Sequence, residues 1–170
     1  MPLSMTTNNS EIKLGVGDLA VSIKPNESIK TFALGSCVAL FLLDIESGAV
    51  GMGHIALPNS KTAPEKARIL PGYFADTGIS ALIAKMARWG FKGNYRRLRA
   101  KITGGSHYVD RADYFMIGKK NVSAIKKILE NNKIKIVGED VGLTFCRTVM
   151  VNVGTFKVTL SSPGKKDWYL

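Results

Sequence analysis

Hydrophobic and polar positions alternate along the chain with two different periods, which predicts both strands and helices. Residues 38–44 form a continuous apolar run that is too short for a typical helix and rich in branched side chains, so we expect a strand buried on both faces. Residues 49–57 return to this pattern after the polar stretch 45–48, which favours an antiparallel hairpin. Two adjacent buried strands are therefore predicted.

Two segments show the spacing of an amphipathic helix. Residues 73–89 carry apolar side chains at positions i, i+3, i+4 and i+7, and Gly90 ends the segment. Residues 119–131 show a second amphipathic pattern, with Lys126 and Lys127 on the polar side. We expect both helices to cover a sheet.

Shorter apolar or alternating segments predict the remaining strands, at residues 14–23, 98–102, 134–137, 147–153 and 156–160. The first of these contains a turn at Gly17 and Asp18. The polar, proline-containing stretch 59–71 is expected to be an exposed loop. Strands outnumber helices, so the predicted fold class is a layered α/β or α+β domain.

The chain of 170 residues is long enough for one hydrophobic core. The predicted domain spans residues 11–160. Residues 1–10 are polar and are expected to form a flexible tail, and residues 161–170 are expected to form a loosely held tail.

Composition narrows the cellular setting. Two cysteines make no disulfide framework, and their spacing to the two histidines indicates no zinc site, so we expect neither a metal nor an organic cofactor. The polar N-terminus does not look like a signal peptide, and no apolar run is long enough to span a membrane. A reduced, cytoplasmic setting is predicted.

The net charge of +11, from 24 Lys and Arg against 13 Asp and Glu, implies attraction to an acidic partner. Nucleic acid, anionic lipid and an acidic protein surface all fit that sign. The basic clusters at 96–101 and 119–135 lack the interleaved aromatic residues of a single-strand stacking platform, and a solvated basic face is the favoured explanation of them. Nucleic acid is therefore disfavoured.

One cysteine and one histidine lie on the predicted hairpin. With a turn centred between Ile45 and Glu46, the residue opposite His54 is Cys37. A thiol needs a nearby imidazole to become a useful nucleophile at neutral pH. As structure alone, Cys37 is a small apolar residue at a strand end and His54 a satisfied core histidine. As a pair, they predict nucleophilic chemistry.

Three further residues extend that hypothesis. Gly35 allows a substrate to approach the backbone closely, and the N–H groups around Gly35, Ser36 and Cys37 are candidates for stabilising an oxyanion. The imidazole of His54 needs a third group to orient it. Thr31 is the best local candidate, because its hydroxyl can accept from a ring N–H.

These residues also carry a resemblance. Residues 31–39, 51–54 and 57–58 resemble the signature of the chemoreceptor glutamine deamidase family (CheD) of bacterial chemotaxis. Matching segments continue in order at 73–76, 100–105, 117–121 and 139–142. The resemblance implies hydrolysis of glutamine side chains on chemoreceptor cytoplasmic helices, with Cys37 as nucleophile, His54 as base and Thr31 as third member.

The resemblance also implies a β-sandwich-like core flanked by helices, similar to the catalytic domain of cytotoxic necrotizing factor toxins, and a CheC-type phosphatase as a partner in some lineages. Two segments depart from the family pattern. Residues 142–146 place Cys146 where a glycine is common, and Gly105 is followed by the bulkier Ser106 and His107. A non-catalytic adaptor that binds a CheC-type phosphatase or receptors stays open as the alternative.

Overall fold

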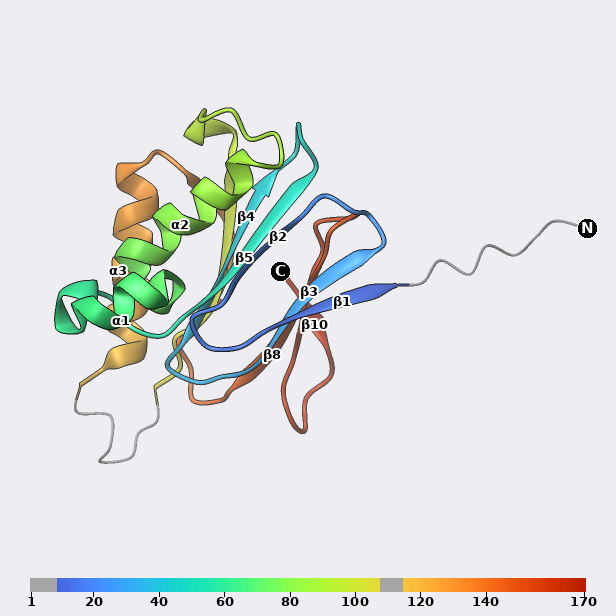
Figure 1. Ribbon diagram of the computed structural model, residues 1–170. Helices are drawn as coiled ribbons and strands as arrows, with labels where there is room; N and C mark the ends of the chain where they lie inside the picture. Colours follow the sequence, from blue (N-terminus) through green and yellow to red (C-terminus); the bar gives the residue numbers. More distant parts are fainter. Residues whose placement is uncertain (1–8, 108–114) are drawn as a thin grey trace, which may run out of the picture.

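Two five-stranded β-sheets and a layer of helices make up the fold, as a computed structural model shows for residues 9–107 and 115–170 (Figure 1). The first sheet has the strand order β1 (Ser10–Leu14), β3 (Glu27–Leu34), β8 (Arg147–Asn152), β9 (Val158–Ser161) and β10 (Trp168–Tyr169). The second sheet has the order β2 (Leu19–Ser22), β5 (Ala49–Ile55), β4 (Val38–Asp44), β6 (Arg99–Gly104) and β7 (Lys135–Val141).

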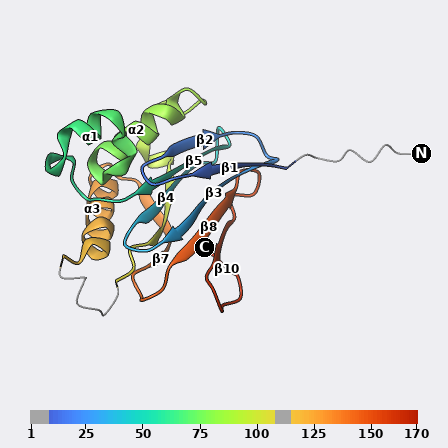
Figure 2. The same cartoon turned by 60° about the horizontal axis from the view of Figure 1, so that its bottom comes forward.

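The helices belong to the outer layer. Two longer helices, α2 (Ala75–Ala87) and α3 (Ile117–Asn131), pack on the second sheet, and the short α1 (Pro64–Ile69) precedes them. Single 3₁₀ turns occur at η1 (Ser60–Thr62), η2 (Pro71–Tyr73) and η3 (Tyr95–Arg97). Figure 2 shows the helices on one side of the second sheet and the first sheet on the other.

The core is divided by the second sheet. Because successive side chains of a strand point to opposite faces, β4 contributes Leu40 to the cluster under the helices and Phe41 to the cluster between the sheets. All seven residues of β4 are buried, as the apolar run predicts. The predicted sandwich-like core with flanking helices is confirmed.

Two expectations about connecting segments are wrong. Residues 59–71 form η1 and α1 rather than an open loop, because Pro64 at the first helical position starts a short helix. The C-terminal residues are not loosely held: β10 pairs with β9, and the indole Nε1 of Trp168 donates to Asp140 at 2.6 Å. The indole adds apolar area and a side-chain hydrogen bond to those that Leu170 makes, since Leu170 N–H donates to Val158 O at 3.0 Å and Lys101 Nζ donates to Leu170 O at 2.6 Å.

Residues 9–23 form two separate strands, one in each sheet, instead of the single predicted strand. Residues 1–8 lie outside the described residues, and β1 begins at Ser10 and pairs in parallel with β3. The segment 14–23 is not one strand with a turn. It leaves the first sheet at Leu14 and enters the second sheet at Leu19, so the turn around Gly17 passes from one sheet to the other.

Candidate active site

The β4–β5 hairpin carries Cys37 and His54, in a register that differs from the predicted one. His54 pairs with Ala39, and Asp44 pairs with Ala49, so the turn is centred one residue later than expected. The hydroxyl of Ser47 donates to Asp44 at 2.7 Å and stabilises this turn. Extending the ladder by one step places Cys37 opposite Ala56.

This correction leaves Cys37 and His54 on one face. Side chains alternate with a period of two, so a register change of two residues preserves the face. Cys37 is packed against the cluster between the sheets, the face that Ala39 and Met52 share with His54. Cys37 thus lies one residue before the last ladder pair, Val38–Ile55, on the sheet face that His54 also occupies.

Thr31 lies across from His54 in the other sheet. Its Oγ1 is 2.7 Å from His54 Nδ1, and its hydroxyl donates to the carbonyl oxygen of Leu14 at 2.8 Å. A threonine has one hydroxyl hydrogen, so the oxygen must accept from the Nδ1–H of the imidazole. Neutral His54 therefore has its free lone pair on Nε2.

The surroundings of His54 favour the neutral ring. The residue is 4% exposed, and burial lowers the pKa of the imidazole, while the carboxylate of Asp18 opposes part of that change. The backbone is fixed as well, because Gly17 N–H donates to His54 O at 2.8 Å and His54 N–H donates to Asp18 O at 3.1 Å. A neutral base in a fixed position results.

Cys37 is half-buried at the entrance of β4. Burial raises the pKa of its thiol, so the thiol stays protonated at neutral pH. A neutral thiol beside a neutral imidazole is suited to proton transfer during attack, rather than to a preformed thiolate–imidazolium pair.

The backbone of residues 35–37 is held entirely through its carbonyl groups. Ser106 N–H donates to Gly35 O at 2.8 Å, Gly105 N–H donates to Cys37 O at 2.8 Å, and the Nδ2 of Asn121 donates to Ser36 O at 3.0 Å. Within residues 9–107 and 115–170, no atom accepts from the three N–H groups of this segment. Fixed, unpaired N–H groups beside a thiol are the donors that an oxyanion requires.

A buried arginine, Arg147, supports the backbone of residues 35–37 indirectly, through Ser106. Arg147 is 0% exposed; its Nε donates to Asp140 at 2.7 Å and its Nη1 donates to Ser106 Oγ at 2.9 Å. Nη2 lies 2.6 Å from the same carboxylate but is not aligned for a hydrogen bond, so it contributes charge attraction alone. Arg147 thereby holds Ser106, whose N–H binds Gly35.

The predicted site residues are thus brought together. Thr31 contacts His54, Cys37 shares its face, and Gly35 and Ser36 lead into Cys37; their catalytic roles stay predictions. The supporting roles of Ser106, Asn121 and Arg147 are not predicted by the sequence pattern. The signal available for Asn121 was its place in the 117–121 segment, three residues after a glycine.

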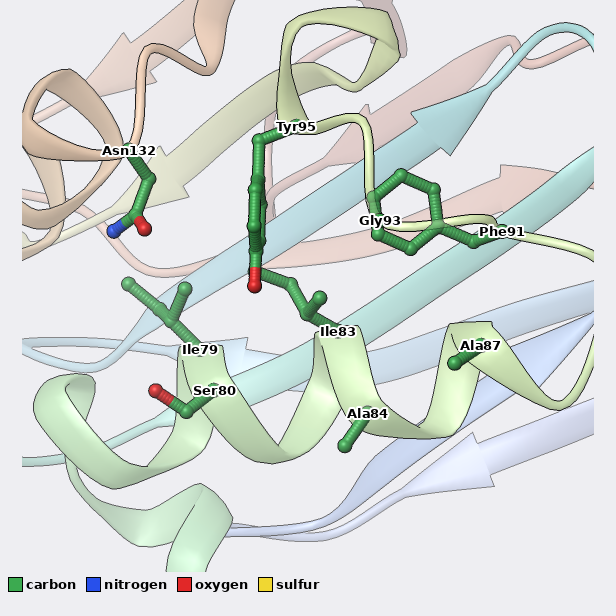
Figure 3. Close-up of a pocket in the computed structure, with 9 residues that line it drawn as sticks. All are labelled: Ile79, Ser80, Ile83, Ala84, Ala87, Phe91, Gly93, Tyr95 and Asn132. Atoms are coloured by element: carbon green, nitrogen blue, oxygen red, sulfur yellow. The ribbon is translucent and has the colours of Figure 1, made fainter.

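Other features of the described chain lie apart from this site. A groove of about 250 Å³ is formed by aliphatic residues of α2, the segment 91–95 and Asn132, with the Tyr95 ring pointing toward α2 (Figure 3). Within residues 9–107 and 115–170, no three His, Cys, Asp or Glu side chains gather as metal ligands. Among the described helices, none has the length and apolar character needed to span a bilayer.

Comparison with known proteins gives consistent relatives. A family model described as CheD chemotactic sensory transduction matches residues 56–162. The chain is 42% identical over 161 residues to the probable chemoreceptor glutamine deamidase CheD of Syntrophotalea carbinolica, covering 95% of this chain and 99% of that protein. A protein of the same name from Solibacter usitatus is 39% identical over 156 residues, covering 92% and 91%.

Among solved structures, the hypothetical protein YfiH of Bacillus licheniformis is similar with a TM-score of 0.48 and 16% identity, covering 83% of this chain and 62% of that chain. The similarity to cytotoxic necrotizing factor toxins stays a prediction.

Proposed function

Because the chain belongs to the CheD family, we propose that it hydrolyses glutamine side chains of chemoreceptors to glutamate, with release of ammonia. The observation that carries this proposal is the arrangement of Thr31, His54 and Cys37. The hydroxyl of Thr31 fixes the tautomer of the buried His54 imidazole and leaves the lone pair of Nε2 free. His54 also shares a sheet face with the Cys37 thiol.

The acylation step uses these groups in order. The Nε2 of His54 takes the thiol proton as the sulfur of Cys37 bonds to the carboxamide carbon of the substrate. Negative charge develops on the amide oxygen, where the unpaired N–H groups of residues 35–37 stabilise it. The imidazolium then protonates the leaving nitrogen, the C–N bond breaks, and ammonia departs from a thioester.

The deacylation step regenerates the site. The Nε2 of His54 removes a proton from water as its oxygen bonds to the thioester carbon, and the same N–H groups stabilise the second oxyanion. The C–S bond breaks, the sulfur recovers the proton from the imidazolium, and the product leaves as glutamate. Throughout, Thr31 keeps Nδ1 as the donor nitrogen.

The proposed substrate implies a setting and a steering force. Receptor helices face the cytoplasm, so the protein acts there. Its net charge of +11 attracts an acidic protein surface and speeds encounter with it. A CheC-type phosphatase is a further proposed partner, and the adaptor alternative would bind either such a phosphatase or the receptors.

Mass spectrometry of a receptor cytoplasmic fragment tests the proposal. Wild-type protein should add about one dalton at each modified glutamine, since NH₂ is exchanged for OH, and Cys37→Ala should add none. Cys146→Ala is the matched control, because Cys146 is the second free, half-buried cysteine. It should retain activity within about twofold, as expected of a substitution outside the reacting groups.

Deamidation by Cys37→Ala at the wild-type rate would overturn the proposal. Receptor or phosphatase binding with no mass change in any variant would favour the adaptor instead.

A further inference from the structure

The side chain of Asn121, in the second turn of α3, reaches the backbone on both sides of the candidate site. It is 0% exposed, and its Nδ2 donates to Ser36 O at 3.0 Å and to Ala56 O at 2.8 Å. Ser36 immediately precedes Cys37, and Ala56 follows His54 by two residues. One nitrogen therefore joins the segment of the thiol to the strand of the imidazole.

This bridge occurs where the sheet can no longer join the two segments. The β4–β5 ladder ends at the pair Val38–Ile55. Beyond it the backbone turns away, because Ala56 N–H donates to Tyr73 O at 2.9 Å. The amide of Asn121 takes over from the ladder, with one hydrogen for each segment.

The amide orientation follows from its neighbours. Exchanging the oxygen and nitrogen would set Oδ1 against two carbonyl oxygens, so Nδ2 must face them. Oδ1 is then buried with no donor among the described residues. A buried polar atom without a partner is unfavourable, and an apolar side chain would fill this space without it. What asparagine alone contributes here is the pair of donors.

The start of α3 is fitted to the same backbone. A Cβ on Gly118 would lie 2.5 Å from the carbonyl oxygens of both Gly105 and Ser106. Those two residues donate to Cys37 O and Gly35 O. Gly118 and Asn121 are three residues apart and share a helix face. The close approach at Gly118 is what lets Asn121 reach Ser36.

We propose that Asn121 is a positioning residue that sets the separation of Cys37 and His54 and fixes the Cys37 N–H. In a trans peptide the carbonyl and the following N–H point in opposite directions, so holding Ser36 O determines the direction of the Cys37 N–H. This role rests on the proposed deamidation for its consequence in catalysis, but the geometry it predicts can be measured separately.

Steady-state kinetics on a receptor fragment give the first measurement. Asn121→Leu removes both donors at similar volume, and it should lower kcat about 100-fold with KM within about threefold, the pattern of misplaced reacting groups. Asn131→Leu is the matched control, an exposed asparagine of the same helix, and should behave as wild type. The proposal would be overturned if Asn121→Leu raised KM without lowering kcat, or if Asn121→Leu and Asn131→Leu lowered kcat equally.

Alkylation of Cys37 by iodoacetamide tests the geometry without any receptor. In a Cys146→Ala background, His54→Ala should slow alkylation about tenfold, since the base no longer takes the thiol proton. When Asn121→Leu is also present, the effect of His54→Ala should shrink to about twofold or less, which is the signature of lost pairwise coupling.

Equal effects of His54→Ala in both backgrounds would contradict the proposal, as would no effect in either. If the wild-type protein does not deamidate receptors, the proposed function fails while this cycle still decides the role of Asn121. Should Asn121→Leu not fold, Asn121→Ser takes its place, because a hydroxyl keeps one donor and adds no volume. It should fold with an intermediate loss of coupling, and full wild-type coupling in it would refute the two-donor bridge.

Discussion

Thr31 and His54 belong to different sheets, and the 2.7 Å hydrogen bond between Oγ1 and Nδ1 joins the two layers. Both side chains are buried, at 0% and 4% exposure, so water does not compete for this bond. The orientation of the imidazole therefore depends on how the first sheet packs on the second. Substitutions that alter this packing should affect the site even where they touch no reacting atom.

Replacing the hydroxyl of Thr31 tests this relationship directly. Thr31→Val keeps the shape but leaves Nδ1–H without an acceptor, so kcat should fall about 100-fold, the lower end of the range for one general-base contribution. Thr31→Ser restores the hydroxyl and should recover most of the activity. Ammonia release measures both, with thermal unfolding as the check on folding. Wild-type kcat in Thr31→Val would exclude the orienting role.

The pH dependence of kcat/KM should follow the neutral form of His54. Burial lowers the pKa of this imidazole below its ordinary value of 6.5 and raises that of the Cys37 thiol above 9.0. The base is therefore active at neutral pH, and activity should fall only on acidification, with a midpoint below 6.5. Initial rates across pH 5–8, an interval of about three units around the histidine range, measure it. A midpoint above 6.5 would indicate a preformed ion pair instead.

Stability should depend on pH through the same residue. In the unfolded chain His54 takes a proton at its ordinary pKa of 6.5, whereas the folded protein resists it. Below that pH the unfolded state binds more protons, so the free energy of unfolding should decrease as the pH falls. His54→Gln should reduce this slope. Ser123→Ala, at an exposed position without a titratable group, should keep the wild-type slope in denaturant titrations.

Removing the buried guanidinium of Arg147 should be strongly destabilising. Arg147→Met fills similar volume but leaves Asp140 without its cation and Ser106 Oγ without its donor. Breaking a fully buried pair costs about 3–5 kcal/mol, and because the side chain of Asp140 is 22% exposed and keeps the hydrogen bond from Trp168, we expect a loss of about 3 kcal/mol in free energy of unfolding. Urea denaturation measures the loss, and Arg88→Met on the exposed end of α2 is the control. A loss equal to that of the control would show that Arg147 does not stabilise this region.

A methyl group at position 118 should push α3 away from the site. The added Cβ of Gly118→Ala would meet two backbone carbonyl oxygens at 2.5 Å, and backbone cannot rotate aside as a side chain can. We expect a loss of about 1–3 kcal/mol in stability, as for overpacked positions, together with lower kcat. Ser123→Ala, exposed on the same helix, should change neither quantity. Unchanged kcat in Gly118→Ala would separate the helix position from catalysis.

Local pattern was sufficient for much of this protein. The apolar run at 38–44 predicts β4, and the 3.6-residue spacing predicts α2 and α3. In each case the spacing of apolar residues indicates whether one face or both faces of the element are buried. The pairing of Cys37 with His54 was placed two residues out of register. Their common face was still correct, since strand side chains alternate with a period of two.

Contacts between layers were decided only by the tertiary structure. Asn121 and Asn131 lie ten residues apart in one amphipathic helix, yet only Asn121 is buried, and it binds backbone 85 and 65 residues away. Arg147 reaches Ser106 across 41 residues, in a chain with many other basic residues that lie exposed. Sequence by itself determined the central strand β4, the two longer helices α2 and α3, and the face that the reacting groups share. The positions of the two sheets and α3 decided which polar side chains are buried at the site. A polar side chain that is buried there loses its hydrogen bonds to water and must find a partner in the protein.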